Sequence, residues 1–228
     1  MSAYDLTPVM GIVDQGNPQP YSAATYQQFR LSAFRHQLVD QVMPKYGELI
    51  RMGKVFHVSG GVVGNGVGSV QDMPTTAAGF ALYNGNTVQS NVHVVPLKVS
   101  LYGTGATGTM GLGTAAIAGV STSPQSSPVA KATGVVGPNN AYATSSNVSN
   151  AVLGSTITLA GAPAWVVLGG RDTPAAIEIG AGFLFDIDGL FLVPPKYCLG
   201  MHVLAPAGSN PAAFLFTVLF AEYQIIAQ

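Results

Sequence analysis

The sequence predicts a mainly β protein, an antiparallel β-sandwich that follows an N-terminal arm and one helix. Short apolar runs recur between Gly, Pro, Asn and Asp residues throughout the chain after Gly53. Residues 97–101 alternate apolar and polar side chains, as a half-buried strand does. Only 8% of the 228 residues are charged, about a third of the usual fraction. Together these features favour a sandwich whose surface is partly covered by other protein.

The N-terminal part, residues 1–53, has a different composition from the rest. Prolines and glycines in residues 1–20 predict an extended arm, which cannot bury enough apolar surface to fold alone. A helix is predicted next, with Ser22 as its N-cap and Pro44 limiting its end. Leu31, Phe34 and Leu38 recur at helical spacing on one side of it. We expect this arm and helix to dock on neighbouring subunits.

The second part, residues 54–228, is expected to form the sandwich domain. The strands predicted in it are 54–59, 79–83, 92–102, 151–160, 164–168, 175–179, 183–187, 190–193, 199–204 and 213–226. Asp188-Gly189 is a hairpin signal between two of them. Residues 103–150 form an insertion rich in Gly, Thr, Ala and Ser, which predicts either a β-rich excursion, with residues 115–120 pairing elsewhere, or a small second lobe.

Composition also limits the classes of partner. Nine Lys and Arg against ten Asp and Glu make a net charge of -1, so no field attracts nucleic acid or anionic lipid. Residues 151–170 are uncharged and long enough to span a bilayer. Their glycines, Pro163 and period-two alternation instead favour two strands joined by a turn. The single cysteine, Cys198, allows no intrachain disulfide and fits folding in a reducing cytoplasm.

No motif predicts a catalytic, cofactor or metal site. Residues 103–108 spell GTGATG, but no acidic residue follows at the distance that a dinucleotide fold needs. The four histidines, His36, His57, His93 and His202, show no metal-ligand spacing, which leaves only a zinc site assembled from distant positions. Asp186 and Asp188 could bind calcium or act in acid–base chemistry, although turn chemistry explains them as well. We expect no enzyme and no cofactor.

Two blocks of sequence carry a family resemblance. The first is GFALYN at 79–84 with VVPLKVS at 94–100, and the second is GLFLVPP at 189–195, LGMHV at 199–203 and FTVLFAEY at 216–223. Over 79–102 and 183–226 the chain resembles the jelly-roll virion proteins of tailed phages. The resemblance implies a jelly-roll sandwich in a homo-oligomer that decorates or cements the capsid or forms head fibres. It also implies assembly in the host cytoplasm and contacts with the major capsid protein or other virion proteins.

The last strand suggests where copies of the chain meet, because residues 214–220 are apolar on both faces. One face fits a sandwich core, and the other needs a second cover, such as a subunit interface, which we expect to form a trimer. The contact residues predicted in the arm are Phe29, Phe34, Leu38 and Tyr46, and those predicted in the sandwich are Phe214, Phe216 and Phe220. The alternatives are the major shell protein of a jelly-roll virus and a receptor- or glycan-binding fibre tip. Trp165, placed in an apolar strand, speaks against a fibre tip.

Overall fold

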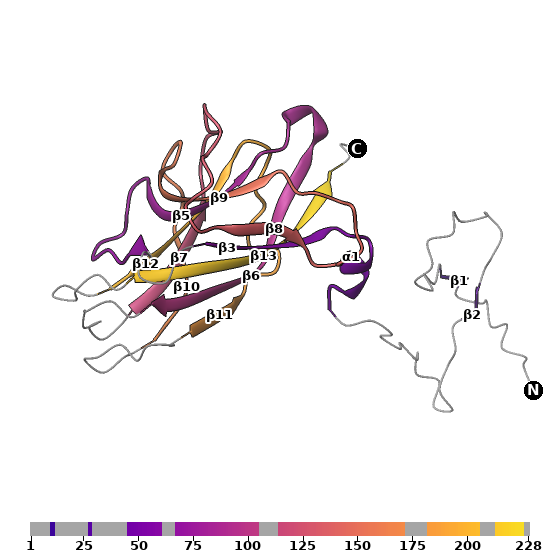
Figure 1. Cartoon of the computed structure of the whole chain (residues 1–228), viewed down its shortest axis with the longest axis horizontal. Helices are drawn as coiled ribbons and strands as arrows, with labels where there is room; N and C mark the ends of the chain where they lie inside the picture. The colour runs from indigo at the N-terminus through magenta and orange to yellow at the C-terminus, as the bar shows by residue number, and fades with distance from the viewer. Residues whose placement is uncertain are drawn as a thin grey trace, which may run out of the picture. The chain divides into compact units, whose positions relative to one another are not determined.

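The computed structural model describes residues 10–11, 27–28, 45–60, 67–104, 114–171, 182–205 and 213–225 (Figure 1). The chain divides into two compact units, Met1–Glu48 and Leu49–Gln228. In the first unit, β1 (Met10–Gly11) pairs antiparallel with β2 (Gln27–Gln28). The helix predicted before Pro44 and the contact residues Phe29, Phe34 and Leu38 lie outside the described residues.

A short helix that the sequence did not predict, α1 (Gly47–Arg51), precedes the sandwich. Glu48 lies in its first turn and Arg51 in its last, so both charges complement the helix dipole. Gly53, with a φ of 64°, turns the chain from α1 into the first long strand.

The larger sheet contains six strands in the order β11-β6-β13-β3-β8, with β4 pairing to β13 off this path. Their bounds are β3 (Val55–Gly60), β4 (Val67–Gly68), β6 (Val92–Thr104), β8 (Val136–Asn140), β11 (Gly182–Asp186) and β13 (Ala213–Gln224). All pairs in this order are antiparallel. The register between β6 and β13 shifts between Leu219 and Phe220, opposite Pro96, which has no N–H to donate to the ladder.

The second sheet contains five antiparallel strands in the order β10-β7-β12-β5-β9. Their bounds are β5 (Ala77–Asn84), β7 (Thr114–Val120), β9 (Ala151–Thr158), β10 (Val166–Arg171) and β12 (Cys198–Leu204). A single-turn 3₁₀ helix, η1 (Val88–Ser90), connects β5 to β6. The fold is therefore an antiparallel β-sandwich, which confirms the fold class predicted from the sequence.

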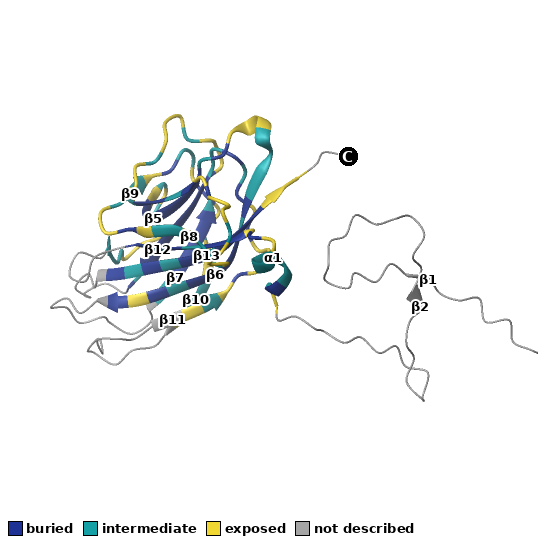
Figure 2. Cartoon of the chain, turned by 45° about the vertical axis from the view of Figure 1, so that its right-hand side comes forward, coloured by how far each residue is buried: buried dark blue, intermediate teal, exposed yellow. Residues whose placement is uncertain are grey.

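The core lies between the two sheets and is built from alternate residues of each strand. Phe80 of β5 and Phe216 of β13 meet across it, with ring centroids 5.1 Å apart. Phe56 and Phe220 stack on neighbouring strands of the larger sheet at 5.8 Å. Each fully buried side chain of this size contributes about 1.5–3 kcal/mol by leaving water. Buried residues accordingly follow the strands, and exposed ones gather in the connections (Figure 2).

The five-stranded sheet carries a smaller apolar cluster on its other face. Tyr83 and Cys198, which point away from the main core, pack there with Leu159 and with the half-buried Val129 and Trp165. Loops that follow β7 and β9 supply Val129 and Leu159. This face is thus partly covered within the chain itself.

The structure corrects one predicted strand and leaves another untested. Residues 190–193 form no strand, because a turn at 188–190 follows β11 and only Val193 makes a bridge, to Val94. Asp188-Gly189 is therefore a turn without a hairpin. The predicted strand 175–179 lies outside the described residues.

The region predicted as an insertion, 103–150, becomes part of both sheets. Residues 114–120 form β7, which pairs with both β10 and β12, so the prediction that 115–120 pairs elsewhere is confirmed. β8 extends the larger sheet beyond β3.

The uncharged run 151–170 forms β9 and all of β10 except Arg171, as the alternation predicted. The two strands are not partners, because they lie at opposite edges of the five-stranded sheet. Within the described ranges, no helix combines the length and the apolar character needed to cross a bilayer.

Candidate contact surface on the six-stranded sheet

The six-stranded sheet has an outer face that is apolar and exposed at both of its sides. We define this outer face by the side chains that alternate with the core residues of β11, β6, β13, β3 and β8. Leu184 on β11 is 65% exposed, Tyr102 on β6 is 42% exposed, and Val136 on β8 is 62% exposed. Strand alternation places them there, because their sequence neighbours Leu101, Val135 and Phe185 pack in or against the core. Large exposed apolar side chains on one face of a sheet are typical of a contact surface.

The middle of the outer face is lower than its sides. The register aligns Leu184, Ser100, Thr217, Ser59 and Val136 in one row across five strands. The three central residues carry only small hydroxyl side chains, and the Ser59 and Thr217 hydroxyls lie 2.9 Å apart. A hollow of about 160 Å³ lies here, with Tyr102 and Val136 at its rim. A groove between two apolar ridges is a shape into which a partner's side chains can pack.

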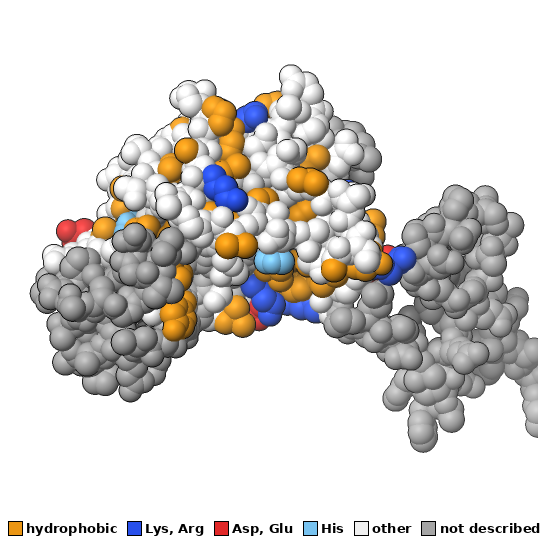
Figure 3. Space-filling model, in the orientation of Figure 1, with side chains coloured by type: hydrophobic (Ala, Val, Ile, Leu, Met, Phe, Trp, Pro, Cys, Tyr) orange, Lys and Arg blue, Asp and Glu red, His pale blue; other side chains and the backbone are white. Residues whose placement is uncertain are grey.

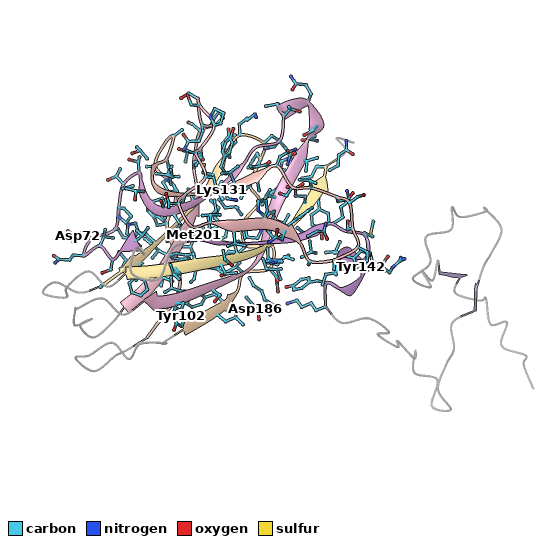
Figure 4. All side chains as sticks on the ribbon, in the orientation of Figure 1. Asp72, Tyr102, Lys131, Tyr142, Asp186 and Met201 are labelled. Atoms are coloured by element: carbon cyan, nitrogen blue, oxygen red, sulfur yellow. The ribbon has the colours of Figure 1, made fainter. Side chains whose placement is uncertain are left out.

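The charge on the outer face is balanced. Lys98 of β6 and Asp186 of β11 face each other across the strand pair with Nζ and Oδ1 2.7 Å apart. Both side chains are exposed enough for water and salt to screen them, so the pair contributes little to stability. Figure 4 shows Tyr102 and Asp186 on the same side of the sandwich, beside β6 and β11. Figure 3 shows how few charged side chains are visible among the uncharged and hydrophobic ones.

The contact residues predicted on the last strand require a correction. Phe214, Phe216 and Phe220 are 1%, 2% and 0% exposed, so their side chains lie inside the chain's own core and not on a contact surface. The surface that β13 offers is its other face, with the half-buried Leu215 and Leu219. Because the strand is apolar on both faces, its sequence does not show which face packs in the core. In the structure the face with the larger aromatic side chains packs there.

The remaining predicted contact residue, Tyr46, lies in the turn before α1. Its φ of 68° places it in the left-handed region. The Lys45 ammonium lies 5.2 Å from the centre of its ring, within the range of a cation–π contact.

A buried polar cluster closes one end of the sandwich. We call Asn84, Asn86, Ser149 and Glu222 the end cluster; these residues are 0%, 6%, 7% and 9% exposed. The Ser149 hydroxyl donates to Glu222 Oε1 at 2.5 Å, and the Asn86 amide donates to Asn84 Oδ1 at 3.0 Å. Burial raises the pKa of the Glu222 carboxyl, although hydrogen bonds from Ser149 and Asn86 and the charge of Lys54 act in the opposite direction.

Two other side chains that could react or bind a metal, Cys198 and His202, are buried. Cys198 is fully buried, and burial raises the pKa of its thiol to about 11, so the reactive thiolate is scarce at neutral pH. His202 lies on the face of β12 opposite Leu199, Met201 and Val203, as predicted, and burial lowers its pKa. Within the part of the chain that the structure describes, no group of three or more His, Cys, Asp or Glu side chains could hold a metal ion.

No protein-family model and no curated protein matches this sequence.

Proposed function

We propose that this chain is a structural protein of a virus particle, of the kind found in tailed phages. Its jelly-roll domain stabilises or decorates the capsid through contacts between copies of itself, with the major capsid protein or other virion proteins as its further partners. Its place is then the capsid surface, and its assembly takes place in the host cytoplasm.

The observation that carries this proposal is the nested pairing of the strands. Without the short β4 and the added β8 and β9, eight strands remain in the sandwich. The first of these strands, β3, pairs with the last, β13, and the second, β5, pairs with the seventh, β12. The third, β6, pairs with the sixth, β11, and the fourth, β7, pairs with the fifth, β10. Such nesting arises when one long antiparallel hairpin rolls up, which supports a jelly roll of two Greek keys. Viral capsid domains are among the proteins built this way.

A second support is the composition of the surface. A chain with 8% charged residues and a net charge of -1 has little to keep copies apart in solution. The outer face adds Leu184, Tyr102 and Val136, whose apolar surface is exposed in the single chain. Contacts of this kind, repeated over many copies, stabilise a shell even when each is weak.

Two alternatives remain. The same nested pairing supports a subunit of the shell itself. A receptor- or glycan-binding fibre tip is favoured by Tyr102, an exposed aromatic ring beside a groove lined with the Ser59, Ser100 and Thr217 hydroxyls. Lectins are also built as jelly rolls, which supports a glycan-binding role.

The mass of the full chain in solution tests the proposal. We expect a homo-oligomer, a trimer, in native mass spectrometry and analytical ultracentrifugation. Leu184→Ser should weaken association by about tenfold or more per contact, because burying a leucine contributes about 1.5–3 kcal/mol. Leu190→Ser is the matched control, since Leu190 is 54% exposed in a turn away from the outer face.

A chain that stays monomeric at every concentration would contradict the proposal. Electron microscopy of the same sample separates the alternatives. Closed shells formed by the chain alone indicate a shell subunit, whereas small oligomers that attach to preformed capsids indicate a decoration protein. Binding on a glycan array that Tyr102→Ala abolishes indicates a fibre tip.

A further inference from the structure

The end cluster is a second feature of the sandwich, separate from the outer face. Glu222 has the same orientation on β13 as Phe216, so its carboxyl points into the end of the sandwich rather than into solvent. It meets Ser149, which belongs to the connection between β8 and β9. A carboxyl that is 9% exposed therefore joins the last strand to this connection.

The β8–β9 connection, residues 141–150, is held by different chemistry before and after Val148. We call residues 141–147 its first half and residues 148–150 its second half. At the first half, the Asn147 side-chain amide donates to the Gly53 carbonyl at 3.1 Å, and the amide of Asn140, the last residue of β8, donates to the same carbonyl at 2.9 Å. Those bonds contain no titratable group. At the second half, Ser149 donates to Glu222, and the Asn150 amide donates to Asn86 Oδ1 at 2.9 Å. Only the second half depends on the protonation of a side chain to which it bonds.

We propose that Glu222 is a proton-sensitive lock that holds the second half of the β8–β9 connection against the last strand. Its carboxyl binds a proton more tightly in the closed end than after opening. The connection is then held more firmly in mild acid than at neutral pH. The second half carries Val148, which is 81% exposed, so the lock also sets how firmly this apolar side chain is held at the surface.

The direction follows from the linkage between protonation and opening. Burial raises the pKa of Glu222 above its ordinary value of 4.5, to which the carboxyl returns when the end opens into water. The closed end therefore holds more protons than the open one between those two pKa values. Rising pH through this window weakens closure, and falling pH strengthens it.

The groups around the carboxyl modify this behaviour without reversing it. Lys54, just before β3, is the cation that acts on Glu222, and its charge favours the ionised form. Ser149, Asn86 and the Asn150 backbone also favour the ionised form by hydrogen bonding. On neighbouring positions, His93 of β6 pairs in register with Tyr223; burial lowers the pKa of His93 and raises that of Tyr223. The loss of water around the Glu222 carboxyl outweighs these opposing effects, so its pKa is raised.

Hydrogen exchange of the full chain measured across pH tests the lock. The Ala151 amide, which donates to Ser149 Oγ at 3.0 Å, reports on the second half, and the Asn147 amide, which donates to Ser145 Oγ at 3.2 Å, reports on the first. After correction for intrinsic exchange, protection at Ala151 should fall as pH rises from 4.5 toward neutral. The fall should reach about tenfold for each unit that separates the closed and open pKa values. Protection at Asn147 should change much less.

Three variants complete the experiment. Glu222→Gln, which keeps the shape and hydrogen bonding of the side chain, should abolish the pH dependence at Ala151. Ser149→Ala removes a bond that favours the ionised form, so it should move the midpoint of the dependence to higher pH. Because this variant also removes the acceptor of the Ala151 amide, its midpoint is read at the Asn150 amide, which bonds to the Glu222 carboxyl. Asn147→Ala is the matched control and should lower protection in the first half at all pH values equally. An equal pH dependence at Ala151 in the wild type and Glu222→Gln, or a flat profile in the wild type, would overturn the proposal.

Discussion

Single residues of the last strand show how the chain divides its apolar side chains. Phe214, Phe216, Val218 and Phe220 point into the core, and the alternate positions, Leu215, Thr217 and Leu219, remain half-buried on the outer face. Phenylalanine fills more core volume than leucine, and Phe216 packs against Phe80 of the opposite sheet. One apolar face of the strand thus packs in the core, and the other is available for contact with another copy of the chain.

This division predicts different consequences for two neighbouring substitutions. Phe216→Ala should lower the free energy of unfolding by about 3–5 kcal/mol, because it leaves a cavity between the sheets. Leu215→Ala should cost much less stability, since Leu215 is only half-buried, but it should weaken association between copies. Urea denaturation measures the first effect and ultracentrifugation the second. Equal losses of stability in the two variants would contradict the assignment of the faces.

Strands and connections depend on Asn84 at one end of the sandwich. Its side-chain amide donates to the Val92 carbonyl at 2.8 Å and to the Val193 carbonyl at 3.0 Å. It therefore fastens the end of β5 to the start of β6 and to the segment before β12. Its backbone also pairs with Tyr197 and Lys196. A fully buried amide with this many partners holds three parts of the chain in place.

Removal of that amide should loosen all three parts together. We expect Asn84→Ala to lower the free energy of unfolding by about 2–4 kcal/mol, because it removes both hydrogen bonds to the Val92 and Val193 carbonyls and leaves a cavity at a fully buried position. Thermal unfolding followed by circular dichroism measures the loss. Asn139→Ala on β8, where the asparagine is exposed, is the control and should change stability by less than about 0.5 kcal/mol. A neutral Asn84→Ala would show that water replaces the amide.

The whole molecule consists of two units with different content. The unit from Leu49 to Gln228 holds both sheets and the buried core. The unit from Met1 to Glu48 contains the short β1–β2 pair among its described residues. The boundary lies within α1, five residues before the one expected from composition. The sandwich thus contains what a domain needs in order to fold alone.

Deletion of residues 1–48 tests this division. The fragment 49–228 should unfold cooperatively with a Tm close to that of the full chain, as measured by calorimetry. If the arm docks on neighbouring subunits, the same fragment should lose higher-order assembly or capsid attachment in sedimentation. An unfolded fragment would show that the sandwich needs its first unit. A fragment that assembles as the full chain does would remove the docking role of the arm.

Local patterns located most strands because alternation and turn residues act within a few positions. The predictions around β3, β5, β6, β9, β10, β11, β12 and β13 agree with the structure to within a few residues. β8 was missed, since its sequence VGPNN has little β-propensity and its proline suits only an edge strand. Residues 190–193 have strand-like composition, but only Val193 bridges to a strand, at Val94 of β6, so the segment remains a connection. Local preference yields to pairing in such cases.

Composition and short-range pattern were thus sufficient to establish a charge-poor, antiparallel β-sandwich, because burial and strand periodicity are written in neighbouring residues. The nested pairing, the inward choice of Phe216 and the outer face with Leu184 and Val136 emerged only from the folded chain. The end cluster likewise joins Ser149 to Glu222, 73 positions apart. Contacts between distant residues depend on how all strands pack at once, and no local window of sequence contains that information.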